Sequence, residues 1–446
     1  MHRSLALICA ISCLSSGCGG TASNGASAAP PPAAPGAAPP ATETAPPLAA
    51  QAAPAATATT PPAAPSPAAI HASAIVIDTH DDVTQRLVID AADIGKPLPD
   101  AQTDIPRMQA GGLDAEFLSV WVAPMLYPGE KAYAQSLAEF AAIDAMIAKN
   151  TEHAVLARSA GDVRAAAAAG KTAFLIGVEG GHSLGEAGDD ELLHRLKTFY
   201  DRGARYMTLT WSNSNRLGGS SGDAGKTKGL TPFGRRVVTA MNDLGMIVDI
   251  SHVSDATFTD AVQASRLPVL ASHSSARALS PHPRNMTDEM LKAVAANGGA
   301  VCVNFGPEFL DAEWNKQWKA AEERAGFVAI VKAHGKDLAG AQREIWGKLR
   351  SLAAELPHVP ASKAIDHIEH IAKVAGVDHT CLGSDFDGIP AGPSGLDDVS
   401  KFPFVTEQLL ARGFSESDVR KILGENVLRV LEANERGRAP VQTPTR

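Results

Sequence analysis

The sequence predicts an α/β protein, a (β/α)8 TIM-like barrel with a helical insertion before the last strand. The first observation is that the chain contains eight short apolar runs rich in Val, Ile, Leu and Phe. The second is that polar residues follow these runs, as they do on the functional face of such a barrel. The runs cover residues 75–78, 115–122, 173–178, 206–210, 246–250, 269–272, 300–305 and 381–384.

Segments of helical periodicity separate these runs. Between the second and third runs, apolar residues are spaced by three and four positions, which is typical of a helix packed on a sheet. Because such helices connect the strands of parallel sheets, we expect parallel strands. The charged segment 308–356 has no strand-like run, so it predicts the helical insertion, which would shield the site. The helical stripe consists of Leu137, Phe140, Ile143 and Ile147.

A doubly wound sheet is the alternative for this alternation of strands and helices. When such a sheet binds a dinucleotide, a glycine-rich turn follows its first strand. Residues 79–84 read THDDVT instead, so no dinucleotide fingerprint is present there. The eight runs and their polar ends therefore favour the barrel.

The N-terminal residues predict export. Residues 1–17 combine Arg3 with an apolar stretch over 5–14, the layout of a signal peptide that is too short to span a membrane. Cys18 follows a lipoprotein-type processing site and is the candidate lipidation site. We expect a bacterial membrane-anchored lipoprotein that faces the periplasm or the cell exterior. The alternative is a soluble periplasmic or secreted protein.

The remaining domain organisation follows from composition. Residues 18–70 are dominated by Ala and Pro with Ser, Thr and Gly, which predicts a disordered tether. The barrel is expected over 71–435 and a flexible tail over 436–446. The formal net charge of -9 offers no basic surface, so we expect no nucleic-acid partner and no membrane contact beyond the lipid anchor.

Cys302 and Cys381 are the two cysteines of the predicted barrel domain, and each lies inside an apolar run. Two isolated cysteines of this kind do not define a disulfide framework. A buried strand cysteine usually behaves as a small apolar side chain. We therefore expect both cysteines to act in this way.

Residue types that bind metals recur where the runs end. His80 and Asp82 follow the first run two residues apart, so an extended chain points them to the same side. Glu179 follows the third run, and His252 and His273 follow the fifth and sixth. Imidazole and carboxylate groups are zinc ligands. Their shared position on one barrel face predicts a two-metal hydrolytic centre in which Glu179 can bridge both metals.

A further carboxylate follows the eighth run. Asp385 is not required as a ligand, so we predict that it is the catalytic proton carrier. Beside a metal-bound water it would accept the proton as hydroxide attacks and return it to the departing amine. Asp387, two residues later, is expected to orient its neighbours.

These motifs resemble the membrane (renal-type) dipeptidase family, peptidases of the amidohydrolase superfamily. The similarity spans about residues 75–432 and includes DTHDD, GVEGGHS, LGMIVDISHVS, SHSSARALSPHPRN and GSDFDG. The resemblance implies zinc-dependent hydrolysis of small dipeptides by a metal-bridging hydroxide, with two Zn²⁺ per chain. A homodimer is the expected protein assembly.

The resemblance also implies a role for each site residue. His80 and Asp82 would hold one zinc, His252 and His273 the other, and Glu179 both. Arg284 would clamp the terminal carboxylate of the substrate, and Asp385 would handle the proton and the free amine. The list of metal ligands is therefore His80, Asp82, Glu179, His252 and His273, and the list of substrate-binding residues is Arg284, Asp385 and Trp211.

Trp211 is a departure from the family pattern. Characterised dipeptidases of the family carry a histidine after the fourth strand, where it contacts the substrate, whereas this chain has Trp211. An indole cannot act as an imidazolium does, so stabilisation of the oxyanion from this strand and the preferred substrate are open. Asn213 or Asn215 is the candidate replacement donor.

Two other motifs have simpler interpretations. Residues 218–222 match G-x-S-x-G, but the nucleophile elbow requires a strand before and a helix after, and polar residues lie on both sides. His367, Glu369 and His370 have helical spacing, yet three isoleucines mark that helix as packed, so capping and surface packing explain the histidines.

Two functional alternatives remain at this stage. One is another amidohydrolase-type activity, such as lactone or acyl-amino-acid hydrolysis, on the same metal centre. Lactonases and phosphotriesterases typically have His-x-His and a bridging lysine, whereas this chain has His80-x-Asp82 and Glu179. The other alternative is a catalytically impaired metal-binding lipoprotein, which would keep the ligands without needing Asp385.

Overall fold

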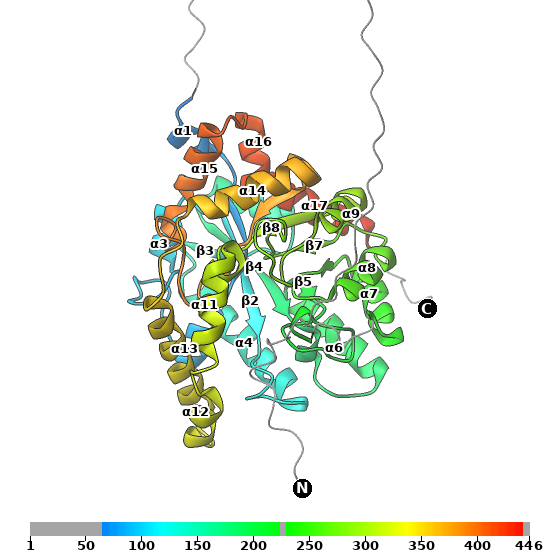
Figure 1. The fold of residues 1–446 in the computed structure, drawn as a ribbon. Helices are drawn as coiled ribbons and strands as arrows, with labels where there is room; N and C mark the ends of the chain where they lie inside the picture. The colour runs from blue at the N-terminus through cyan, green and yellow to red at the C-terminus, as the bar shows by residue number, and fades with distance from the viewer. Residues whose placement is uncertain (1–64, 224–228, 440–446) are drawn as a thin grey trace, which may run out of the picture. The chain divides into compact units, whose positions relative to one another are not determined.

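Eight parallel strands form a nearly closed barrel in the computed structural model, which describes residues 65–223 and 229–439 (Figure 1). Neighbouring strands follow the order β1-β2-β4-β5-β6-β7-β8-β9, and a parallel bridge between Asp81 and Phe386 joins the two ends of this series. The predicted (β/α)8 barrel is confirmed. Its strands are β1 (Ile77–Asp81), β2 (Ala115–Trp121), β4 (Thr172–Glu179), β5 (Ala204–Thr208), β6 (Ile247–Asp249), β7 (Leu270–Ala271), β8 (Ala300–Val303) and β9 (Thr380–Leu382).

One described strand was not predicted. β3 (Ala154–Leu156) pairs with β4 in parallel and lies outside the series of barrel strands.

Helices connect and surround the strands, as the periodicity predicts (Figure 1). The predicted stripe lies on α4, where Phe140 and Ile143 are fully buried. The helices are α1 (Pro67–Ser73), α2 (Thr84–Ile89), α3 (Ile105–Ala110), α4 (Glu130–Lys149), α5 (Ala160–Ala168), α6 (Asp189–Arg202), α7 (Pro232–Leu244), α8 (Asp255–Ala264), α9 (Asp288–Asn297), α10 (Pro307–Leu310), α11 (Ala312–Glu322), α12 (Phe327–His334), α13 (Leu338–Ala354), α14 (Ser362–Ala375), α15 (Phe402–Ala411), α16 (Glu416–Arg420) and α17 (Asn426–Gly437).

Local sequence sets where the helices near the site begin and end. Thr231, Ser254 and Thr287 each accept a backbone N–H of the first turn of α7, α8 and α9. A cap of this kind stabilises a helix by about 1 kcal/mol. Gly245 and Gly298 end α7 and α9 with φ of 75° and 82°, a backbone conformation that glycine adopts without strain.

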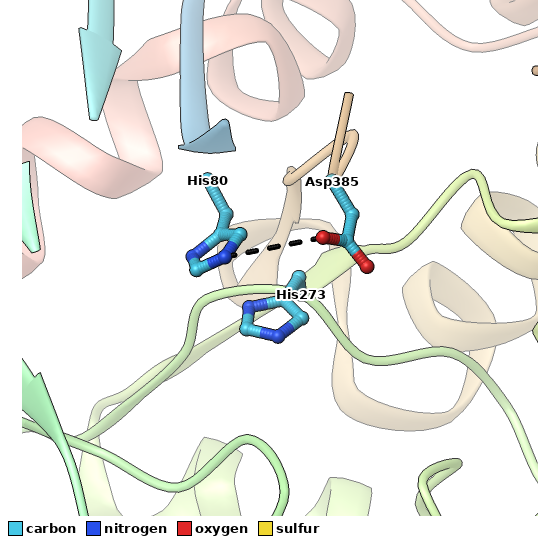
Figure 2. A group of neighbouring side chains, drawn as sticks. All are labelled: His80, His273 and Asp385. Atoms are coloured by element: carbon cyan, nitrogen blue, oxygen red, sulfur yellow. Dashed lines mark ion pairs between the residues drawn. The ribbon is translucent and has the colours of Figure 1, made fainter. Parts of the chain in front are cut away.

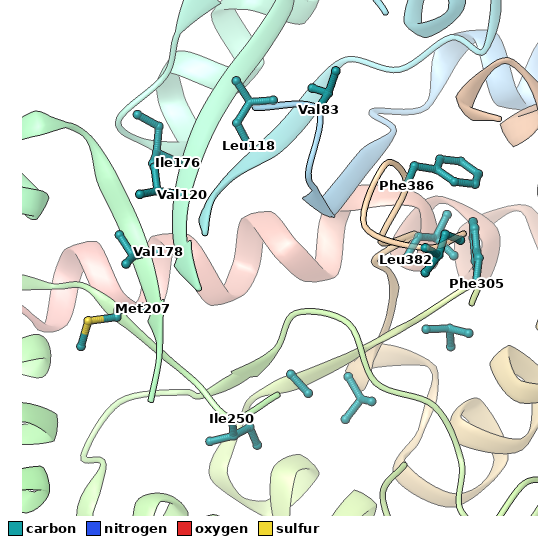
Figure 3. Packing of buried hydrophobic residues seen from close by; sticks show 14 of the residues in the cluster. Val83, Leu118, Val120, Ile176, Val178, Met207, Ile250, Phe305, Leu382 and Phe386 are labelled. Atoms are coloured by element: carbon teal, nitrogen blue, oxygen red, sulfur yellow. The ribbon is translucent and has the colours of Figure 1, made fainter. Parts of the chain in front are cut away.

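Side chains alternate between the two faces of the barrel wall. Leu118 and Ile176 belong to the large outer cluster that packs against the helices (Figure 3). Their neighbours Phe117 and Leu175 belong to a second cluster, which also contains Tyr206. Since full burial of one such side chain contributes roughly 1.5–3 kcal/mol, the two clusters fix the strand register that positions the functional ends.

Helices lie near both ends of the described residues. α1 begins at Pro67, before the expected boundary at His71, because Ser66 caps the helix and His71 contacts Thr406. α17 ends at Gly437. The predicted signal peptide, Cys18 and most of the predicted tether lie outside the described residues. No described helix combines the length and apolar character that a membrane crossing requires.

The predicted insertion between the last two strands is confirmed as helical, and it comprises α10 to α13 (Figure 1). Gln342 of α13 donates to Gln85 of α2 over 2.9 Å, so the insertion packs against the segment that follows β1. Phe309 of α10 lies 5.4 Å from the guanidinium carbon of Arg284, measured to the ring centroid. The insertion therefore reaches the residue that is predicted to clamp the substrate.

The expectation for the two strand cysteines was wrong. Cys302 of β8 and Cys381 of β9 form a disulfide, with their Cα atoms 4.1 Å apart. They are direct partners in the parallel register of these strands, which brings together residues separated by 79 positions. The seventh and eighth runs are neighbouring strands already in the predicted barrel, but the spacing of the cysteines does not show that they occupy the same register position.

Candidate metal centre

The five predicted ligands come together at the carboxyl ends of four strands. His80 lies on β1, Asp82 directly follows it, and Glu179 is the last residue of β4. The register between β1 and β2 shifts between Asp78 and Asp81. This local irregularity changes the direction of the side chains at the end of β1. All five ligands are buried, with relative exposures of 8% or less. His252 and His273 complete the set, just beyond β6 and β7.

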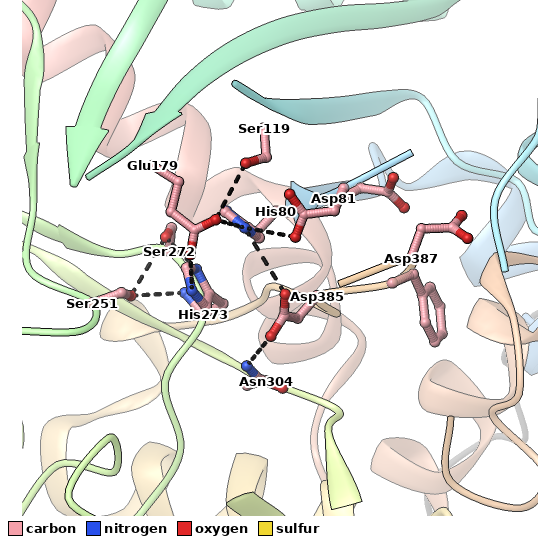
Figure 4. Close-up of polar contacts among 12 residues, drawn as sticks. His80, Asp81, Ser119, Glu179, Ser251, Ser272, His273, Asn304, Asp385 and Asp387 are labelled. Carbon is pink, nitrogen blue, oxygen red and sulfur yellow. Dashed lines mark hydrogen bonds and ion pairs between the residues drawn. The ribbon is translucent and has the colours of Figure 1, made fainter. Parts of the chain in front are cut away.

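Glu179 is the centre of this arrangement (Figure 4). Its Oε2 lies 3.5 Å from Nε2 of His80, and its Oε1 lies 2.9 Å from Nε2 of His252 and 3.5 Å from Nε2 of His273. The two oxygens of one carboxylate thus face different groups of ligands. Two sets have donor atoms within 4.8 Å of one another, namely His80–Asp82–Glu179 and Glu179–His252–His273.

Asp385 lies beside the same donors. Its Oδ1 is 3.9 Å from Nε2 of His80, and Asn304 donates to its Oδ2 over 2.7 Å. Figure 2 shows the carboxylate next to His80 and His273, and these three residues form a third set of potential ligands. Asp385 therefore has one anchored oxygen and one oxygen that faces the metal ligands.

Residues at these strand ends adopt a left-handed backbone conformation. The φ angles are 66° for His252, 66° for Asp385 and 58° for Asp387. For residues other than glycine this conformation costs roughly 1–2 kcal/mol each. Backbone hydrogen bonds compensate, because Ser221 donates to the carbonyl of His252 and Asp385 donates to that of His80.

Hydroxyl groups hold the outer nitrogens of two histidines. Nδ1 of His80 lies 2.7 Å from the Tyr206 hydroxyl, and Nδ1 of His273 lies 2.7 Å from Oγ of Ser272. Each contact leaves Nε2 facing Glu179. Such contacts on the far nitrogen fix the ring orientation and tautomer of a metal ligand.

The donor set fits a divalent cation. Nε2 of His80 and Oδ1 of Asp82 are buried and have no hydrogen-bond partner within the described ranges. Buried polar atoms of this kind are costly unless a partner satisfies them. Three imidazoles and carboxylate oxygens are typical ligands of zinc and related cations.

The protein environment prepares these groups for cations. Burial alone would raise the pKa of Glu179, but the three histidines outweigh it and hold the pKa well below its usual range. Burial, assisted by Arg284, lowers the pKa of His252 to about 3. An ionised carboxylate beside neutral imidazole is the protonation state in which these groups bind metals.

His80 behaves differently. Burial would lower its pKa, but Tyr206, Glu179 and the other carboxylates outweigh burial and raise the pKa well above the ordinary value. A proton and a cation therefore compete for Nε2 of His80. Burial also raises the pKa of Asp385 well above its ordinary value, in agreement with a group that accepts a proton.

Arg284 lies directly behind the ligand His273. Its guanidinium donates to the His273 carbonyl over 3.0 Å and to Oγ of Ser274 over 3.3 Å, while its Nε has no hydrogen-bond partner among the described residues. No carboxylate in the described part of the chain forms an ion pair with it. A buried, fixed guanidinium of this kind is suited to bind a carboxylate from outside the protein.

Trp211 lies at the edge of the same centre. Its ring centroid is 6.4 Å from that of His252 and 5.1 Å from that of Trp121, which it meets edge to face. Asn215 is engaged in its own loop, since its amide donates to Leu209 and accepts from Leu217. Asn213 has a buried side-chain oxygen without a described partner, but this oxygen is an acceptor and does not identify Asn213 as the replacement donor.

The two competing motifs have structural roles, but His367 is buried and neither caps a helix nor packs on the surface as expected. Ser220 donates to the Trp211 carbonyl, and the residues directly before it form a loop and not a strand. His367 accepts from the backbone of Ala276 over 3.0 Å. His370 and Glu369 form ion pairs with Asp288 and Arg412.

Sequence reasoning missed the polar residues that support the ligands. Ser119 donates to Oε2 of Glu179 over 3.4 Å, and Tyr206 and Asn304 contact His80 and Asp385 as described. Strand alternation offers a signal, because polar groups at inward positions of otherwise apolar strands must find partners inside the barrel.

Comparisons with known proteins identify the family of this chain. A family model described as "Membrane dipeptidase (Peptidase family M19)" matches residues 66–445. The chain is 32% identical over 363 residues to dipeptidase ataJ of Aspergillus terreus. This match covers 75% of this chain and 77% of that protein.

Solved structures lead to the same family. The probable dipeptidase PvdM from Pseudomonas aeruginosa has a TM-score of 0.71 at 25% identity, over 83% of this chain and 98% of that one. A metallopeptidase from Rhodobacter sphaeroides, liganded with a phosphinate mimic of the dipeptide L-Ala-D-Ala, has a TM-score of 0.65 at 26% identity. The match covers 81% of this chain and 100% of that one. The chain therefore belongs to the membrane dipeptidase family, peptidase family M19, and is a metallo-dipeptidase with a TIM-like barrel.

Proposed function

We propose that this chain hydrolyses dipeptides with two zinc ions per chain, held as the resemblance implies. The observation that supports this most directly is that the two oxygens of Glu179 face His80 on one side and the pair His252 and His273 on the other. When bound, two zinc ions would lower the pKa of a shared water, so that hydroxide is the nucleophile at neutral pH, and would polarise the peptide carbonyl.

Asp385 is the proposed proton carrier. Asn304 fixes one carboxylate oxygen and leaves the other toward His80. Its raised pKa, caused mainly by burial, favours acceptance of a proton from the nucleophile. The same group then returns the proton to the departing amine.

Arg284 is the proposed anchor for the substrate carboxylate. It is buried, fixed by His273 and Ser274, and free of any described ion pair. A dipeptide carries its carboxylate one residue beyond the scissile bond, so an anchor next to the metal ligands selects short substrates. Longer peptides would place further residues against Phe309 and α10.

The relative from Rhodobacter sphaeroides, which binds a mimic of L-Ala-D-Ala, suggests small dipeptides as the substrate class. We propose that Trp211 makes the substrate side of this site more apolar than a histidine would. The panel of substrates should therefore include L-L, L-D and N-acylated dipeptides and a lactone.

The purified enzyme tests the proposal. We expect about two zinc ions per chain by elemental analysis, and release of both amino acids from at least one dipeptide. Removal of metal with a chelator should abolish this activity, and added zinc should restore it. Metal-loaded protein that cleaves the lactone or acylated compounds but no free dipeptide would instead favour the other amidohydrolase activity. Metal binding without any turnover would favour the impaired lipoprotein.

We also propose export and lipidation at Cys18, which rest on the sequence. A disulfide between Cys302 and Cys381 agrees with an oxidising compartment. In a bacterial host the wild type should partition into detergent and Cys18→Ser into the aqueous phase. If both partition into the aqueous phase, the soluble periplasmic or secreted alternative holds. A homodimer stays a prediction, to be checked by light scattering.

A further inference from the structure

Asp249 is a fully buried carboxylate next to the metal centre that belongs to none of the ligand sets. It is the last residue of β6, three positions before His252. It accepts hydrogen bonds from the hydroxyl of Thr208, the hydroxyl and amide of Ser272 and the amide of Ser251. Asp249 therefore connects the functional ends of β5, β6 and β7.

The hydrogen bonds determine where the proton on Ser272 lies. Each oxygen of Asp249 accepts two bonds, so its four acceptor positions are filled by donors. Ser272 donates its single hydroxyl proton to Oδ2 of Asp249 over 2.7 Å. Toward Nδ1 of His273, also 2.7 Å away, the same hydroxyl can then only accept.

The tautomer of His273 follows from this arrangement (Figure 4). Because Ser272 accepts, Nδ1 of His273 must carry the ring proton. Nε2 then keeps its lone pair and lies 3.5 Å from Oε1 of Glu179 and 2.9 Å from Nε2 of His252, toward which it can only accept. The lone pair is therefore on the atom that has to bind a metal.

We propose that Asp249 is a positioning residue that acts through Ser272 to fix the tautomer and orientation of His273. His80 obtains the equivalent restraint from Tyr206, which donates to the Thr79 carbonyl over 3.0 Å and so accepts from Nδ1 of His80. The proposal rests on the proposed metal centre, but it concerns metal affinity and the tautomer of His273 rather than dipeptide turnover.

Asp249→Asn tests the direction of the hydrogen bonds. The NH₂ group of asparagine donates where Oδ2 of Asp249 accepts from the Ser272 hydroxyl. The Ser272 hydroxyl then turns its proton toward Nδ1 of His273. We expect affinity for the metal held by Glu179, His252 and His273 to fall about 10- to 100-fold, the range found when such supporting contacts are lost. Affinity for the metal held by His80, Asp82 and Glu179 should change much less.

Three measurements decide the proposal in the full-length enzyme. Zinc competition with chelators gives the two affinities, nitrogen NMR of the metal-free protein gives the His273 tautomer, and thermal unfolding reports folding. Thr208→Val is the matched control, because it removes one buried hydrogen bond to Asp249 without touching the Ser272 contact. Ser272→Ala should reproduce the Asp249→Asn effect, and the double variant should add little.

The outcomes are distinct. The proposal is overturned if Asp249→Asn keeps wild-type affinity for both metals, if its His273 tautomer is unchanged, or if Thr208→Val loses as much affinity. It is also overturned if Ser272→Ala binds both metals normally, since Asp249 would then act by another route. A wild-type enzyme that binds two metals but cleaves no dipeptide would contradict the proposed function and leave this inference intact.

Discussion

The two halves of the metal centre differ in charge although both consist of buried ligands. Around His80 lie Asp82 and Asp385, and the pKa of His80 is raised. Around His252 and His273 lies Arg284, and burial lowers the pKa of both histidines, with smaller contributions from His80 and Arg284. Glu179 joins the halves. The acidic half is suited to a cation and a substrate ammonium, whereas the basic half is suited to the substrate carboxylate.

Glu179→Gln should have the largest effect, because it neutralises the one group that both halves share. We expect loss of most bound zinc and activity at background, since an amide supplies one oxygen and no charge. Elemental analysis and dipeptide turnover measure this. Glu191→Gln, on the surface of α6, is the control and should behave as wild type. Retention of two zinc ions by Glu179→Gln would contradict a bridging role.

Asp385→Asn separates proton transfer from metal binding in the acidic half. We expect kcat to fall about 10²- to 10⁴-fold, the usual contribution of a general acid or base, with zinc content unchanged. Asp387→Asn is the neighbouring comparison, because Asp387 accepts backbone N–H groups of Gln102 and Thr103 instead of facing the ligands. If Asp387→Asn loses as much kcat while Asp385→Asn stays active, the assignment is reversed.

Arg284→Met tests the basic half. Loss of a charge-assisted contact to the substrate carboxylate should lower kcat/KM about 10- to 100-fold, mainly through KM. A dipeptide amide, which lacks this carboxylate, should be a poor substrate of the wild type and lose little further with Arg284→Met. An equal loss for the acid and the amide would show that Arg284 supports His273 rather than the substrate.

How far the sequence predicts the site can be judged within these halves. Glu179, His252 and His273 were predictable because parallel strands bring their ends to one face. Tyr206 and Asn304 were not, since an inward position on a strand does not say which ligand lies across the barrel. The Cys302–Cys381 disulfide was missed although its strands are neighbours in the predicted barrel, because the sequence does not show that the two cysteines are direct partners in the strand register.

His367 is a histidine outside the metal centre whose pKa is shifted mainly by burial, so it shows how burial alone affects stability at low pH. It lies far from the ligands in sequence, on α14, and burial lowers its pKa to about 4 from an ordinary 6.5. Because the folded state resists protonation, its stability contribution is present above pH 6.5 and is lost as pH falls toward 4. The loss can reach about 3 kcal/mol, at about 1.4 kcal/mol per unit of pKa shift.

Urea unfolding at several pH values between 7 and 4 measures this effect. His367→Gln should flatten the decline of the unfolding free energy with falling pH. His370→Gln, on the same helix and partly exposed, should keep the wild-type decline. An identical decline in wild type and His367→Gln would mean that other groups, such as the metal ligands, determine acid stability.

Trp211→His should have the smallest effect. It tests whether the apolar indole beside His252 contacts the substrate in the basic half. The Trp211 ring lies near His252 and packs edge to face on Trp121, so its loss removes apolar surface without removing a ligand. We expect the ratio of kcat/KM between dipeptides with large apolar and small side chains to fall about tenfold, as for other apolar contacts. Trp346→His, in the insertion, is the control for the same exchange. If this ratio of kcat/KM and the zinc content are both unchanged, Trp211 does not contact the substrate. Arg284 and Asp385 would then be the residues that select substrates.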